Sequence, residues 1–207
     1  MTAGGTTVAG ASGNAASGGP NSAGGPDGIG TLSALDVLVL AGGTGRRLGG
    51  ASKPDVVARG ARLLDHVLNG VAAVRSPLGG GRSVVVAPVE VEVPDGVLRT
   101  LEDPPLGGPV AGIAAGLARL AAEPGGPAPR TAVLTCDAPE SWRALPVLVR
   151  ALRAAPGSCP GVCALDGDHV QYLLGVYRTM RLHEAVAPGG GPLRDVSVRR
   201  VLGRLGV

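Results

Sequence analysis

Apolar runs that alternate with helical segments are the feature that most constrains how this chain can fold. LDVLVL at 35–40, SVVVA at 83–87 and TAVLTCD at 131–137 are almost continuously apolar. Such runs are typical of strands covered on both faces, as in parallel sheets. Between them, 61–74 has apolar residues at helical spacing, and 109–122 is an Ala-rich apolar segment that begins with proline. The alternation predicts an α/β fold with a mainly parallel sheet and helices on both faces.

The remaining segments extend this pattern toward the C-terminus. We expect a helix over 142–155 and mostly helical structure from about 178 to 205. Further strands are expected over 96–103, 161–165 and 171–177. Asp166, Asp168 and His169 stand between the last two strands, so this polar stretch reads as a hairpin turn.

Composition separates a tail from a domain. The 207 residues are 44% hydrophobic, although the chain has only one Trp, two Tyr and no Phe. Residues 1–30 are almost entirely small or polar, with a single charged residue, Asp27. Such a segment buries too little apolar surface to offset its ordering entropy. We therefore predict a disordered tail over 1–30, which lacks the features of a signal peptide, and one domain over 31–207.

Charge and cysteine usage exclude several classes of protein. The formal net charge is +3, and no basic run is interleaved with aromatics, so no nucleic-acid partner is expected. No apolar run approaches the ~20 residues that cross a bilayer, so no membrane segment is expected. Three cysteines favour reduced thiols in a cytoplasmic protein over a disulfide framework. A metal site at Cys159 and Cys163 with nearby His169 is disfavoured because no second ligand pair is present.

The stretch LAGGTGRRLGGASK, residues 40–53, carries the clearest chemical signal. It follows an expected strand, and its glycines let several backbone N–H groups approach one anion. Arg46 and Arg47 add cations, and Lys53 is the only lysine of the chain. The spacing fits neither a P-loop nor the G-x-G-x-x-G dinucleotide motif. The alternative is a plain glycine-rich turn with solvated arginines, but the preceding strand and the single lysine favour a phosphate-binding loop.

Four segments in order resemble the MobA-like NTP transferase family, the family of the molybdenum cofactor guanylyltransferases. The loop at 40–53 is similar to its L-A-G-G-x-x-x-R-[ML]-G-G-x-x-K signature. EDPPLGGPVAGIAAGL at 102–117 resembles its acid followed by G-P-[LV]-A-G-[IM]. VLTCDAPE at 133–140 is similar to its strand ending in C-D-x-P, and QYLLGVYR at 171–178 to a segment lining its acceptor side.

The resemblance implies a Rossmann-like nucleotidyltransferase fold that binds an NTP, usually GTP, with Mg²⁺. Its implied catalytic residues are Arg47, Lys53 and Asp137, of which Asp137 would also bind the metal. The implied nucleotide-binding residues are Leu40, Ala41, Gly42, Gly43, Lys53, Asp103 and Asp137. Each acid has an alternative role, since Asp137 suits a turn after a strand and Asp103 a surface turn before Pro104.

The implied reaction transfers GMP from GTP to the phosphate of molybdopterin and releases pyrophosphate. Another phosphorylated acceptor, such as a sugar phosphate, and a low-turnover nucleotide-binding protein are the alternatives. A protein of cofactor assembly is a further partner to consider. The alternatives rest on Ser52, which stands where the family often has Asp, and on the absence of the family's N-x-N-T segment after Arg194.

Overall fold

A computed structural model describes residues 34–42 and 53–207, and for Lys53 it describes the backbone alone. All of these residues belong to one structural unit, Thr31–Val207. The tail expected over 1–30 lies outside the described residues, as do Gly43 and Arg47.

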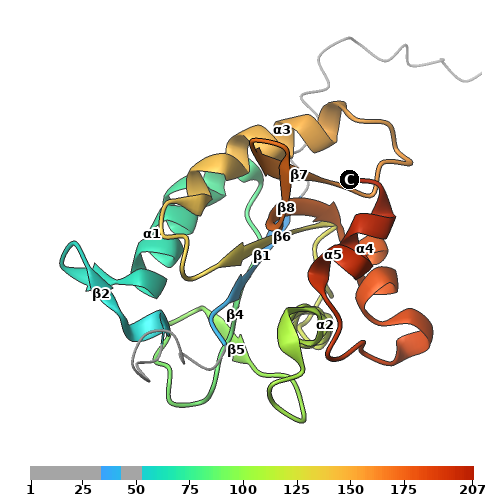
Figure 1. Cartoon of the computed structure of the whole chain (residues 1–207). Helices are drawn as coiled ribbons and strands as arrows, with labels where there is room; N and C mark the ends of the chain where they lie inside the picture. The colour runs from blue at the N-terminus through green and yellow to red at the C-terminus, as the bar shows by residue number, and fades with distance from the viewer. Residues whose placement is uncertain (1–33, 43–52) are drawn as a thin grey trace, which may run out of the picture. The chain divides into compact units, whose positions relative to one another are not determined.

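A six-stranded sheet runs through this unit in the order β5-β4-β1-β6-β8-β7 (Figure 1). Neighbouring strands β5, β4, β1 and β6 pair in parallel, whereas β8 pairs antiparallel with both β6 and β7. The mainly parallel sheet predicted from the apolar runs is confirmed. The strands are β1 Leu35–Leu40, β4 Ser83–Val86, β5 Leu98–Thr100, β6 Arg130–Thr135, β7 Gly161–Asp166 and β8 His169–Arg178.

Helices cover both faces of the sheet, as Figure 1 shows. Helices α1 and α3 lie against one face, and α2, α4 and α5 lie against the other. Their bounds are α1 Leu63–Arg75, α2 Gly108–Ala121, α3 Leu145–Ala154, α4 Thr179–Val186 and α5 Val198–Leu202. Short 3-10 helices are η2 Lys53–Asp55, η3 Ser76–Leu78, η4 Ser141–Ala144, η5 Pro188–Gly190 and η6 Gly203–Leu205.

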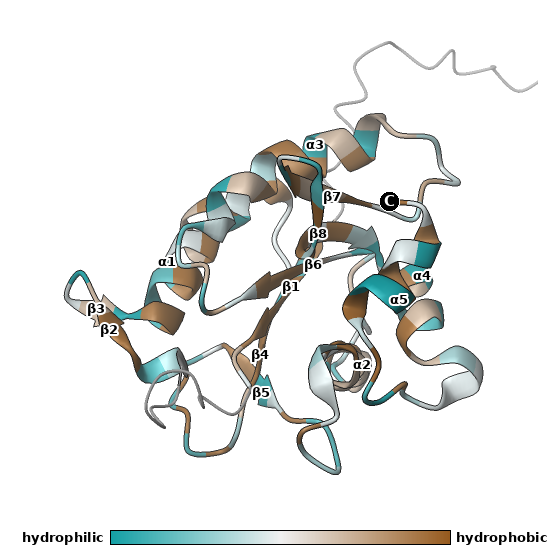
Figure 2. Ribbon diagram, viewed as in Figure 1, coloured by the Kyte–Doolittle hydropathy of each residue, from teal (hydrophilic) through white to brown (hydrophobic). Residues whose placement is uncertain are grey.

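The central strands are buried on both sides, which explains their continuous apolar sequence. In β1, Val37 and Val39 belong to the core beneath α1 and α3, while Leu38 and Leu40 belong to the core beneath α2. Successive side chains of a strand point to opposite faces, so one apolar run supplies both cores. Figure 2 shows the same arrangement as hydrophobic strands at the centre and hydrophilic stretches on the outer surface of the helices.

Two glycines of α2 bring this helix close to the sheet. A Cβ at Gly116 would lie 2.9 Å from the Leu38 side chain, and one at Gly112 would lie 3.3 Å from Val86. The small residues of the G-P-V-A-G-I segment are therefore needed for close helix–sheet packing. This packing fixes the start of α2 beside the edge where β1 ends.

The β7–β8 hairpin closes the far side of the sheet. Asp166 pairs with His169, and Gly167 has a φ of 56°, so the hairpin turn expected here is confirmed. The pairing shifts between Cys163 and Ala164, which leaves a bulge in β8. The buried Tyr177 hydroxyl donates to the Tyr172 carbonyl at 2.6 Å and stabilises this bulge.

Some expected elements differ from the structure near turns. A two-stranded hairpin, β2 Val57–Ala58 and β3 Ala61–Arg62, precedes α1, which therefore begins at Leu63 and not at residue 61. The region 178–205 is only partly helical, because the segment between η5 and α5 is not helical. Pro188, Pro192 and the glycines between them interrupt helical hydrogen bonding there.

Cys136, Cys159 and Cys163 form no disulfide. Among the described residues, no helix is long and apolar enough to cross a membrane.

Candidate functional site

The carboxyl ends of four parallel strands meet at one edge of the sheet. Three backbone hydrogen bonds continue the ladder beyond the strands: Ala41 N–H to Val86 O at 2.9 Å, Ala87 N–H to Thr100 O at 2.9 Å and Cys136 N–H to Leu40 O at 3.1 Å. The loops that follow β1, β5 and β6 therefore leave the sheet from the same edge. In open α/β sheets this edge is where ligands bind.

The first of these loops begins with the predicted nucleotide-binding residues Leu40, Ala41 and Gly42. The Leu40 carbonyl and the Ala41 N–H are engaged in the ladder, and both side chains are buried. Gly42 is exposed, and a Cβ there would lie 3.6 Å from Val86 O and 3.9 Å from Leu101 Cδ1. Of these three residues, Gly42 is thus the one that presents backbone to a ligand.

After Gly42 the described chain resumes at η2. Gly43 and Arg47 lie outside the described residues, and Lys53 is the first residue of η2. The described chain on either side of the loop is the end of β1 at Leu40 and η2, which precedes the β2–β3 hairpin and α1.

The second loop joins β5 to α2 and carries Asp103. Leu101 Cδ1 lies within 3.9 Å of the position that a Cβ at Gly42 would take, so this loop passes next to the start of the signature loop. Asp103 is exposed, and Pro109 occupies the first turn of α2, where its missing N–H costs nothing. The structure thus places Asp103 in a loop at the same edge as Gly42.

Arg194 holds this second loop in place, although the sequence did not mark it as a site residue. Its Nη2 donates to Pro104 O at 2.6 Å, and the neighbouring Asp195 N–H donates to Gly107 O at 2.9 Å. A Cβ at Gly107 would lie 2.6 Å from the Arg194 guanidinium carbon, so a larger residue there would have to displace this guanidinium group. The sequence marks this residue only by the run GGGPLR at 189–194, which by itself assigns it no role.

Arg194 also brings a cation to this loop. Its Nη1 is buried and has no hydrogen-bond partner among the described residues. A buried donor without a partner is costly, so a ligand oxygen in the loop would be stabilised there.

The third loop follows β6 and carries Asp137. Cys136 is buried under α1 and α3, and Asp137, one residue further, is exposed. The loop then turns into η4 through a Ser141 N–H to Ala138 O bond of 2.9 Å. The other carboxylate of this loop, Glu140, is held by Arg143 and by Arg59 at 3.4 Å, and the hydrogen bond from Arg143 lowers the pKa of Glu140.

The donor set fits a magnesium ion that takes most of its ligands from phosphate and water. Within residues 34–42 and 54–207, no group of three His, Cys, Asp or Glu residues is assembled to hold a metal. Mg²⁺ in nucleotide sites uses one or two carboxylates, with substrate phosphates and water completing its shell. The exposed Asp137 carboxylate at the strand end suits that role.

A mainly parallel sheet with a glycine-containing turn and two exposed carboxylates at its carboxyl edge is typical of the α/β proteins that bind nucleotides. The sequence profile of the MobA-like NTP transferase domain matches residues 37–206. The chain therefore belongs to this family, and the family prediction is confirmed.

A sequence relative agrees with this assignment. A molybdenum cofactor guanylyltransferase from Bradyrhizobium sp. (strain ORS 278) is 41% identical over 91 residues, which are 42% of this chain and 40% of that protein. The matched segment thus spans less than half of the relative.

Solved structures show the same fold. Molybdopterin-guanine dinucleotide biosynthesis protein A from Archaeoglobus fulgidus superimposes with a TM-score of 0.52 and 23% identity, covering 82% of this chain and 79% of that one. Rv0371c from Mycobacterium tuberculosis H37Rv superimposes with a TM-score of 0.50 and 18% identity, covering 77% and 80%. The Rossmann-like nucleotidyltransferase fold is thereby confirmed.

Proposed function

We propose that this chain transfers GMP from GTP to the phosphate of molybdopterin and releases pyrophosphate. The observation that carries the proposal is the meeting of three loops at one sheet edge, those of Gly42, Asp103 and Asp137. Family membership supports a nucleotidyltransferase, and the name of the Bradyrhizobium relative supports the choice of GTP and of the molybdenum cofactor.

In this reaction the protein must align GTP with the acceptor and neutralise the negative charge of the phosphates. An oxygen of the acceptor phosphate attacks the α-phosphorus of GTP, and the bond from that phosphorus to the bridging oxygen breaks. The electron pair leaves with pyrophosphate, and no general base is needed because the acceptor phosphate is already ionised. Positioning and electrostatic stabilisation supply the rate enhancement.

Most of the predicted site residues have a role in this scheme, whereas Leu40 and Ala41 anchor the start of the loop in the sheet. Backbone N–H groups at Gly42 and Gly43 would face the triphosphate, and Asp103 would contact the nucleotide. Arg47 and Lys53 would stabilise the charge that grows on pyrophosphate. Asp137 would hold Mg²⁺, which supplies charge neutralisation at the phosphates when it is bound.

Pyrophosphate release tests the proposal directly. The protein is incubated with Mg²⁺, molybdopterin and GTP, ATP or CTP in parallel, and pyrophosphate is measured. We expect release with GTP that depends on molybdopterin. Release that instead depends on glucose 1-phosphate would move the acceptor to a sugar phosphate, and absence of release with every pair would contradict an enzymatic role.

Lys53→Ala tests the signature loop. Loss of the ammonium group should weaken GTP binding by at least about tenfold, since a charge-assisted hydrogen bond contributes about 1.5–3 kcal/mol. The matched control is Arg119→Ala, which removes a cation from the last turn of α2, at the opposite edge of the sheet. Equal GTP dissociation constants for the two variants, measured by calorimetry, would contradict a role for Lys53 in binding phosphate.

A further inference from the structure

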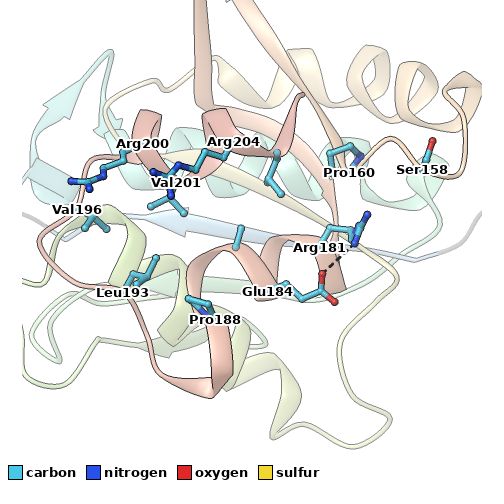
Figure 3. Close-up of a pocket in the computed structure, with 12 residues that line it drawn as sticks. Ser158, Pro160, Arg181, Glu184, Pro188, Leu193, Val196, Arg200, Val201 and Arg204 are labelled. Atoms are coloured by element: carbon cyan, nitrogen blue, oxygen red, sulfur yellow. Dashed lines mark hydrogen bonds and ion pairs between the residues drawn. The ribbon is translucent and has the colours of Figure 1, made fainter.

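A cavity lies between α4 and the α5–η6 segment. Its volume is about 660 Å³, within the range of small-molecule sites. Figure 3 shows Arg200, Val201 and Arg204 on one side of it, and Arg181 and Glu184 of α4 on the other. The cavity shares no residue with the Gly42, Asp103 and Asp137 loops.

The cavity is lined mainly by apolar side chains. Val201 is buried, and Leu193, Val196 and Leu205 are partly buried against the core beneath α2. Pro160 and Pro188 add rigid apolar surface from two further segments. Such a lining favours the apolar body of a small molecule over a fully hydrated ion.

The charges around the cavity are predominantly positive. Arg181, Arg200 and Arg204 line it, and Glu184 is the one acid among the lining residues. Glu184 is paired with Arg181 at 3.4 Å, as the dashed line in Figure 3 marks. Among the residues that the structure describes, Arg200 and Arg204 have no ion-pair partner, so their charges are available to a ligand.

The spacing of these two arginines strengthens the argument. Arg200 belongs to α5 and Arg204 to η6, which follows α5 directly. Both side chains line the same cavity, so two positive charges lie at one surface, and like charges close together repel each other. An anion between the two guanidinium groups would convert this repulsion into attraction, and the guanidinium fork suits phosphate and carboxylate oxygens.

We propose that the α4–α5 cavity binds a small organic anion, with its phosphate or carboxylate at Arg200 and Arg204 and its apolar body against Leu193, Val196, Val201 and Leu205. The site is independent of the proposed transferase reaction. It requires neither GTP nor the residues of the signature loop.

The test uses 8-anilinonaphthalene-1-sulfonate, an organic anion whose fluorescence rises in apolar surroundings. The full-length protein is titrated with this dye in the presence of saturating GTP and Mg²⁺, which block the nucleotide site. We expect saturable binding that the double variant Arg200→Gln/Arg204→Gln weakens by at least about tenfold. The matched control is Arg199→Gln, an exposed arginine of α5 that does not line the cavity, and it should change the dissociation constant less than twofold.

Competition identifies the chemistry of the head group. Both 1-naphthyl phosphate and 1-naphthoate should displace the dye, and the compound that binds more tightly identifies the preferred head group. Neutral 1-naphthol should not displace the dye at the same concentration. Equal weakening by the Arg199 variant, equal displacement by 1-naphthol, or loss of dye binding when GTP is added would each overturn the proposal. Circular dichroism of each variant verifies that the surface substitutions leave the fold intact.

Discussion

At the scale of single residues, Asp137 is the position where a conservative change is most informative. Asp137→Asn keeps the size of the side chain but removes the charge that would hold Mg²⁺. We expect GTP binding without metal to change little, while the gain in affinity that Mg²⁺ gives to the parent protein is lost. Calorimetric titrations with and without Mg²⁺ measure both quantities, and an equal metal effect in the variant would place the metal elsewhere.

Tyr177 shows how one buried hydroxyl shapes the hairpin beside the site. It is fully buried, it donates to Tyr172 O and it lies 3.0 Å from Cys163 Sγ. Tyr177→Phe leaves that carbonyl without its donor and should reduce the free energy of unfolding by about 1–2 kcal/mol. Tyr172→Phe is the control, because among the described residues the Tyr172 hydroxyl makes no hydrogen bond, and it should cost less than about 0.5 kcal/mol. Urea unfolding that gives the same loss for both variants would contradict this role.

The same pair of residues predicts the alkaline pH dependence of stability. Burial raises the pKa of both the Cys163 thiol and the Tyr177 hydroxyl, so the folded state favours their neutral forms. Their contribution is complete below about pH 8 and declines once the unfolded chain loses these protons, near pH 8.5 for Cys and pH 10 for Tyr. Urea unfolding across this range should show a steeper decline above pH 10 in the parent than in Tyr177→Phe. Identical slopes would mean that Tyr177 ionises as readily in the folded state as in the unfolded chain.

At the scale of elements, the sequence predicts the centre of the sheet better than its surroundings. Strands β1, β4 and β6 are buried on both faces, and a continuous apolar sequence indicates a strand buried in this way. The β2–β3 hairpin was missed because its strands have two residues each, and Arg59 at its turn has a φ of 51° that no local residue preference indicates.

The candidate site could be predicted only as far as its residues follow strands. Asp137 comes directly after an apolar run, so its position at the carboxyl edge of the sheet could be predicted from the sequence. Arg194 donates hydrogen bonds to Pro105 O and Pro104 O, which lie 89 and 90 residues earlier in the chain. A contact between such distant segments depends on tertiary packing, and no periodicity or turn signal in a single sequence encodes it.

The contact between α1 and η4 gives a prediction at this scale. A Cβ at Gly70 would overlap the indole ring of Trp142, which follows the Asp137 loop. Gly70→Ala should therefore destabilise the protein by about 2 kcal/mol, although alanine is the better helix former by about 1 kcal/mol. In a Trp142→Ala background the same change should be stabilising by about 1 kcal/mol, because the overlap is gone. Chemical denaturation of the four proteins measures this cycle, and a destabilising Gly70→Ala in both backgrounds would show that the ring is not the cause.

At the scale of the whole molecule, the site is assembled from segments that are distant in the chain. Gly42, the loop of Asp103 and the loop of Asp137 follow three different strands, and Arg194 joins them from near the C-terminal end. A ligand that contacts all of them binds only the folded chain, so its binding free energy adds to the stability of the fold.

GTP with Mg²⁺ should therefore raise the thermal unfolding midpoint. A ligand at about 100 times its dissociation constant adds about 2.7 kcal/mol, which for a domain of this size corresponds to about 5–11 °C. We expect the rise with GTP to exceed that with ATP or CTP, and to shrink without Mg²⁺ or in Asp137→Asn. Because Arg200 and Arg204 belong to none of these loops, Arg200→Gln/Arg204→Gln should keep the full rise with GTP. A rise of equal size with all three nucleotides would remove the preference for guanine while leaving the phosphate-binding loop intact, and no rise with any of them would contradict nucleotide binding itself.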